Sequence, residues 1–131
     1  MGGKMKSLFA KLKRRPAWPD QPRFVKFDAA GFSITEDGEP EVRGDWASIR
    51  EVFAYKLDFF SVDEICIGLR YDSAGMHWWI GEGYVGYKEF LEELPRRFPG
   101  VRTDWFAEVA HPAFVENRTT LWGEPWTPTP K

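Results

Sequence analysis

Residues 81–86, Gly-Glu-Gly-Tyr-Val-Gly, match the G-x-G-x-x-G pattern that binds the pyrophosphate of a dinucleotide. In such sites the glycines let the backbone approach the phosphates at a helix N-terminus, which favours negative charge. The strands predicted before this pattern form hairpins rather than a β-α-β unit. Glu82 would also place a carboxylate beside the phosphates. We therefore interpret the glycines as a turn between a strand and a helix.

A second group of reactive side chains consists of charged residues close to apolar runs: Lys56, Asp58, Asp63, Glu64 and Glu82. A carboxylate pair can hydrolyse glycosides, but nothing in this spacing indicates one, so a small enzyme is the last alternative. Two other interpretations stay open. Either Lys56 pairs with Asp58 or Glu82 and fixes the sheet, or the carboxylates form an acidic rim that attracts a basic protein partner.

Aromatic residues beside these carboxylates offer an anchor for such a partner. Trp78 and Trp79 are adjacent in a predicted strand, so their side chains point to opposite faces. One ring is expected in the core. The other, if exposed beside Tyr84, would suit a binding hot spot, where Trp and Tyr are enriched. The candidate protein-binding residues are Asp58, Asp63, Glu64, Trp79, Glu82 and Tyr84.

The histidines and the single cysteine, which could act as metal ligands or as a nucleophile, are far apart from one another in the sequence. His77 and His111 have no ligand-type neighbour three or four residues further on, so no metal site is predicted. Cys66, the single cysteine, lies in an apolar run and is expected to be a small buried side chain. The sequence predicts no catalytic residue, no cofactor and no internal disulfide.

The N-terminal arm differs in charge from the rest of the chain. Its first fifteen residues carry six basic residues and no acid, which leaves 12 basic and 20 acidic residues elsewhere. Residues 4–15 are predicted to form an amphipathic helix. This helix would bind an anionic membrane or a partner protein, or it would pack on the acidic remainder of the chain. The candidate contacts are Lys4, Lys6, Phe9, Lys11, Lys13, Arg14 and Arg15. An acidic body is a poor match for nucleic acid.

The arm and a Pro-rich linker occupy residues 1–22, a single α+β domain 23–122 and a loose Pro-rich tail 123–131. Apolar alternation predicts an antiparallel meander sheet of about six to seven strands. Asp45 could cap a helical turn that places Trp46 and Ile49 on one face. The expected strands cover residues 23–27, 32–35, 39–43, 50–57, 64–71, 75–80 and, as a last edge strand, 119–122.

One or two helices are expected late in the chain. Tyr87, Phe90, Leu91 and Leu94 have helical spacing. A second helix is expected to hold Trp105, Phe106 and Val109, with Thr103 or Asp104 as its cap. We find no secretory signal and no transmembrane run, and we therefore expect a cytoplasmic protein that is membrane-peripheral if the arm binds lipid.

A series of aromatic, acidic and turn positions runs through the chain: Phe27-Asp28, Gly31-Phe32, Trp46, Ile49, residues 55–58, 63–65, Trp79, Glu82, Phe98-Pro99-Gly100, Trp105, residues 112–114 and Asn117. On these positions the chain resembles small uncharacterised bacterial cytoplasmic proteins, and its meander followed by a helix is similar to bacterial pleckstrin-homology-like domains, some of toxin-immunity type. The resemblance implies a pleckstrin-homology-like fold and a non-enzymatic protein-binding function, with an immunity protein as its specific form. A peripheral membrane adaptor is the alternative.

Overall fold

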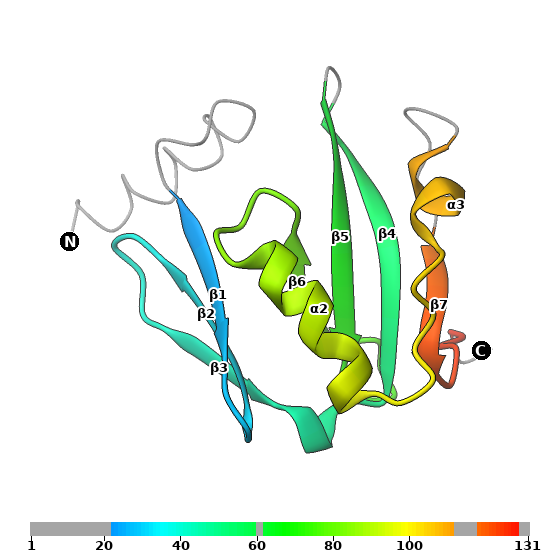
Figure 1. Cartoon of the computed structure of the whole chain (residues 1–131), viewed down its shortest axis with the longest axis horizontal. Helices are drawn as coiled ribbons and strands as arrows, with labels where there is room; N and C mark the ends of the chain where they lie inside the picture. The colour runs from blue at the N-terminus through cyan, green and yellow to red at the C-terminus, as the bar shows by residue number, and fades with distance from the viewer. Residues whose placement is uncertain (1–21, 60–61, 112–117, 129–131) are drawn as a thin grey trace.

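The computed structural model describes residues 22–59, 62–111 and 118–128, and these form an α+β fold (Figure 1). Their strands are all antiparallel and lie in two sheets, ordered β1-β2-β3 and β6-β5-β4-β7. The strands are β1 Arg23–Phe27, β2 Gly31–Glu36, β3 Val42–Asp45, β4 Glu51–Phe59, β5 Val62–Arg70, β6 His77–Gly81 and β7 Arg118–Gly123. Six predicted strands are confirmed with small shifts and β3 begins three residues later than predicted, but the expectation of one sheet is wrong.

A short 3-10 turn, η2 (Trp46–Ser48), separates the two sheets along the chain. Trp46 and Ile49 are both buried, as their spacing predicts. Asp45 precedes the turn but makes no side-chain capping hydrogen bond, so the predicted cap is wrong. The indole Nε1 of Trp46 instead donates to the Asp28 carbonyl at 2.8 Å and ties η2 to the β1–β2 turn.

Two helices follow β6. Helix α2 (Tyr87–Arg97) buries Phe90 and Leu94, which lie on the apolar face that the sequence predicts. Helix α3 (Phe106–Ala110) begins after Trp105, and no side-chain hydrogen bond caps it. The prediction that Thr103 or Asp104 caps this helix is therefore wrong. Figure 1 shows α2 between the first sheet and β5, whereas α3 lies beside β7.

The core is a cluster of large rings that contacts both sheets and α2. Phe32 of β2 lies 5.3 Å from Trp46 and 6.0 Å from Phe90 between ring centroids. Trp46 also lies 5.9 Å from Phe98, the residue that follows α2. Aromatic rings bury a large area per residue, which suits a domain of this size.

The alternation of side chains along β4 divides its residues between two environments. Val52 and Ala54 belong to the core cluster, and Lys56 is buried on the same face. Its Nζ donates a hydrogen bond to the Ala110 carbonyl at 2.9 Å, which fastens the end of α3 to the sheet. Phe53 lies on the opposite face beneath the Arg118 guanidinium, whose carbon is 3.7 Å from the ring centroid.

The segment after β7 is fastened to the second sheet, so the expected loose tail is wrong for its first part. Trp126 donates its indole N–H to the Ser73 carbonyl at 3.0 Å, in the turn between β5 and β6. Its backbone N–H donates to the Glu51 carboxylate at 3.2 Å. The predicted amphipathic helix over residues 4–15 lies outside the described residues.

None of the helices in the described part of the chain combines the length and apolarity that crossing a bilayer requires.

Candidate functional site

A groove of about 260 Å³ opens between α2, the segment after it and the start of α3. Three parts of the chain form its walls: the β6–α2 turn at one end, α2 along one side, and the segment that leads into α3 at the other end. The residues that line it are Glu82, Tyr87, Leu91, Leu94, Pro95, Val101, Arg102, Thr103, Trp105 and Phe106.

The floor of the groove is apolar because of how the chain leaves α2. Leu94, Val101 and Trp105 are buried. The Val101 N–H donates to the Phe98 carbonyl at 3.0 Å and closes the turn after the helix. The Arg102 N–H then donates to the Leu121 carbonyl of β7 at 3.0 Å, which holds the connecting segment against the sheet.

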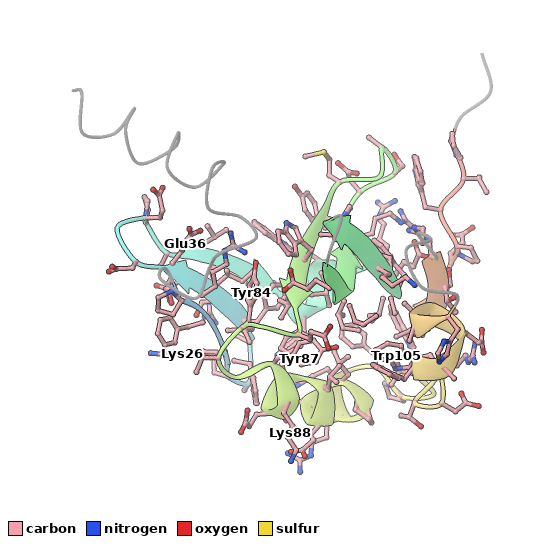
Figure 2. All side chains as sticks on the ribbon, turned by 90° about the horizontal axis from the view of Figure 1, so that it is seen from above. Lys26, Glu36, Tyr84, Tyr87, Lys88 and Trp105 are labelled. Atoms are coloured by element: carbon pink, nitrogen blue, oxygen red, sulfur yellow. The ribbon has the colours of Figure 1, made fainter. Side chains whose placement is uncertain are left out.

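One large apolar side chain is exposed at this groove. Phe106 is 56% exposed, and its ring centroid lies 6.0 Å from that of buried Trp105. Tyr87 and Leu91 are half-buried on the neighbouring turns of α2. Figure 2 shows Tyr87 and Trp105 on the inner side of α2 and Lys88 on its outer side. The groove therefore presents aromatic surface to solvent beside a packed floor.

The groove rim, which we define as the lining residues Glu82 and Arg102 together with Asp104 and Glu108, the ion-pair partners of Arg102, has three carboxylates and one guanidinium. Arg102 Nε lies 3.3 Å from Asp104 Oδ1, and the same guanidinium bonds both carboxylate oxygens of Glu108. The hydrogen bonds to Glu108 and then to Asp104 raise the pKa of Arg102, so it keeps its charge. Because two carboxylates already pair with this cation, the rim is net negative.

Glu82 is held at the other end of the groove by two hydrogen bonds with one residue. Its backbone N–H donates to the Ile65 carbonyl at 2.9 Å, and its Oε1 accepts from the Ile65 N–H at 3.0 Å. Burial raises the pKa of neighbouring Tyr87 above its usual value, and the negative charge of Glu82 raises it further. The Tyr87 hydroxyl is therefore neutral at physiological pH.

Among the sequence-predicted binding residues, three meet inside the molecule. Glu64 and Tyr84 are buried, and Trp79 is half-buried with its ring centroid 5.7 Å from that of Tyr84. The Arg23 guanidinium of β1 lies 5.8 Å from both rings. Burial raises the pKa of Tyr84, although Arg23 acts in the opposite direction. These side chains join β1 to the end of β6.

The other predicted residues are placed differently. Glu82 is exposed and lines the groove. The structure describes the backbone of Asp58 and Asp63 but not their side chains, and all seven candidate contacts of the arm lie outside the described residues. Of the four predicted binding residues whose side chains the structure describes, only Glu82 lines the groove.

The glycine pattern before α2 has a packing explanation. A Cβ on Gly81 would overlap the Glu64 carboxylate, and one on Gly86 would overlap the Val25 carbonyl oxygen. Gly86 also has a φ of 96°, which favours glycine. Val85 exchanges backbone hydrogen bonds with Arg23 and Val25 of β1. The interpretation of this stretch as a turn is confirmed.

Sequence reasoning missed most of the groove because it placed the lining residues in two separate helices and gave a binding role to none of them except Glu82. Trp105 and Phe106 were expected together in one helix, but Trp105 precedes α3 and points inward while Phe106 points outward. No local signal sets Phe106 apart, because Phe90 also stands between acids, Glu89 and Glu92, and is fully buried.

In the part of the chain that the structure describes, no three His, Cys, Asp or Glu side chains are grouped to hold a metal ion. No family model matches the chain, and no curated protein or solved structure matches it significantly.

Proposed function

We propose that this chain is a non-enzymatic protein-binding domain whose groove takes an apolar side chain from a basic segment of a partner protein. The exposed ring of Phe106 beside the apolar groove carries this proposal. Aromatic side chains that border a pocket with a polar rim are typical of protein interfaces. The net negative rim favours a partner whose flanking residues are Lys or Arg.

The size of the groove supports a protein partner over a free small molecule. Pockets for cofactors and drug-sized ligands have volumes of about 300–1,000 Å³ and enclose most of the ligand. A groove of about 260 Å³ is smaller than this range and suits one anchoring side chain. The rest of the partner would then lie across the surface, over Phe106 and the outer turns of α2.

A more specific form of the proposal is a pleckstrin-homology-like domain of toxin-immunity type. Two antiparallel sheets with one main helix support that likeness, although β7 follows the helices here. The acidic body supports capture of a basic toxin segment, because opposite charge accelerates association. The membrane-adaptor alternative depends on the sequence of residues 4–15 alone.

Site-directed photo-crosslinking in the native cell tests the proposal. The photoreactive residue p-benzoyl-L-phenylalanine replaces Phe106 in one variant of the full chain and Met76 in another. Met76 is a matched control because it is 55% exposed and lies outside the groove. We expect one protein adduct from position 106 and none from position 76. The same adducts from both positions, or none from position 106, would contradict the proposed use of the groove.

A further inference from the structure

We infer that Glu82 determines the specificity of the groove by selecting a Lys or Arg that is adjacent to the partner's apolar anchor. This inference rests on the proposed function, because it concerns the same groove. It adds which residue of the groove contacts the basic side chain and where that side chain lies relative to the anchor.

The Glu82 side chain is held in a fixed position by hydrogen bonds, which makes it suitable for this role. Both the backbone N–H and the Oε1 of Glu82 are hydrogen-bonded to Ile65, the residue just before β5 begins to pair with β6 at Cys66. A carboxylate fixed in this way loses little conformational freedom when a ligand binds. Within the described part of the chain no donor bonds Oε2, and the residue is exposed, so this oxygen is available to a cation.

The other charges of the groove favour a cation at Glu82 and disfavour an anion anywhere in the groove. Arg102 is already paired with Asp104 and Glu108, so it offers no unneutralised positive charge. Lys88 points away from the groove on the outer side of α2 (Figure 2). Tyr87 stays neutral beside Glu82, so its hydroxyl can share in hydrogen bonding without adding charge.

A Lys or Arg side chain also matches the shape of this end. Its aliphatic stem can cover the half-buried surface of Tyr87 and Leu91 while its charged group reaches Glu82. The anchor next to it would then occupy the floor over Trp105 and Val101. Such a contact is charge-assisted and depends on one fixed acceptor. We therefore expect the partner segment to place a basic residue next to an apolar one.

Peptide titrations of the ¹⁵N-labelled full-length protein test this inference, with backbone amide shifts of Tyr87 and Trp105 as the readout. The probes are acetyl-Lys-Phe-Lys-amide and its counterpart with Gln in place of both Lys, with affinities expected in roughly the millimolar range. We expect the wild-type protein to bind the Lys peptide about tenfold more tightly than the Gln peptide.

Glu82→Gln should abolish that preference by lowering the affinity for the Lys peptide to that for the Gln peptide. Gln keeps an oxygen to accept from the Ile65 N–H, so the turn should be retained. Glu92→Gln is the matched control, since Glu92 is an exposed acid on α2 outside the groove. It should keep the tenfold preference.

The outcomes separate the two proposals. A preference that survives in Glu82→Gln would overturn the role of Glu82 and leave the groove as a binding site. Shifts at neither Tyr87 nor Trp105 with any peptide would overturn both proposals. A synthetic peptide of residues 4–15 serves as a third probe. If it binds much more tightly than acetyl-Lys-Phe-Lys-amide, the groove belongs to the chain's own arm, and the assignment to a partner protein fails.

Discussion

At the residue scale, Glu51 is a fully buried carboxylate that joins three strands and the C-terminal segment. It accepts from Arg70 Nε at 2.9 Å, from both terminal nitrogens of Arg118 at 2.8 and 2.9 Å, and from the Thr120 hydroxyl at 2.6 Å. The backbone N–H of Trp126 also donates to it. A buried charge with this many donors is well compensated, and its removal leaves two guanidinium groups without their shared partner.

Glu51→Gln should therefore destabilise the protein by about 3–5 kcal/mol, the usual cost of breaking a buried ion pair from one side. Urea unfolding monitored by circular dichroism measures this loss. Asp28→Asn is the control, because the ion pair of Asp28 with Arg43 is exposed and should contribute little. A loss for Glu51→Gln no larger than that for Asp28→Asn would contradict the structural role of Glu51.

The same carboxylate should make stability depend on pH in the acid range. Burial raises the pKa of Glu51, but the hydrogen bonds from Arg118, Thr120 and Arg70 outweigh this effect and lower it from 4.5 to about 2. The stabilisation is therefore complete above pH ~4.5 and is lost as the pH falls towards ~2. A shift of this size corresponds to about 3 kcal/mol.

We expect the difference in unfolding free energy between wild type and Glu51→Gln to shrink across that window. Urea titrations at several pH values between pH ~6 and pH ~2 measure it. A difference that stays constant with pH would show that the Glu51 pKa is not lowered in the folded protein.

At the element scale, most strands could be predicted from the sequence, because the alternation of apolar and polar residues along a strand indicates which face is buried. It misplaced β3, which was expected over residues 39–43 but spans Val42–Asp45. Pro40 has no N–H to donate and cannot continue the ladder, so pairing with β2 resumes only at Val42. The turn between β2 and β3 contains Asp37-Gly38, a pair typical of hairpins, and Gly38 has the positive φ of 83° that such turns require.

The junction between β6 and α2 depends on Gly86 for two separate reasons, conformation and space. Gly86→Ala should destabilise the protein by more than the ~1–2 kcal/mol that left-handed backbone costs an ordinary residue, because its Cβ would also overlap the Val25 carbonyl. Gly100→Ala is the matched control, with a φ of 88° and no atom near the added Cβ. Urea unfolding of both variants measures their losses of unfolding free energy, and the difference between the two is the cost of the overlap. Equal losses would show that β1 and the start of α2 are not in close contact.

At the scale of the whole molecule, the sequence could not predict which strands pair across long stretches of chain. Alternation in residues 118–123 fits any edge strand, but only the folded chain shows that β7 pairs with β4. The groove was missed for the same reason. Glu82 follows β6 and Trp105 precedes α3, and no local pattern reports that α2 brings them to one groove. Local periodicity identifies elements, whereas sites between elements depend on their packing.

The two sheets share one aromatic core, so we expect them to unfold together. Phe90 of α2 contacts Phe32 of the first sheet and Trp46 of the connecting turn. Phe90→Ala should cost about 3–5 kcal/mol, because it leaves a cavity at this junction. When the wild-type protein is unfolded in guanidinium chloride, the transition followed by tryptophan fluorescence should coincide with the transition followed by far-ultraviolet circular dichroism. Exposed Phe106→Ala should change stability little and keep the same coincidence. Separate transitions in the wild-type protein would mean that each sheet is stable without the ring cluster between them.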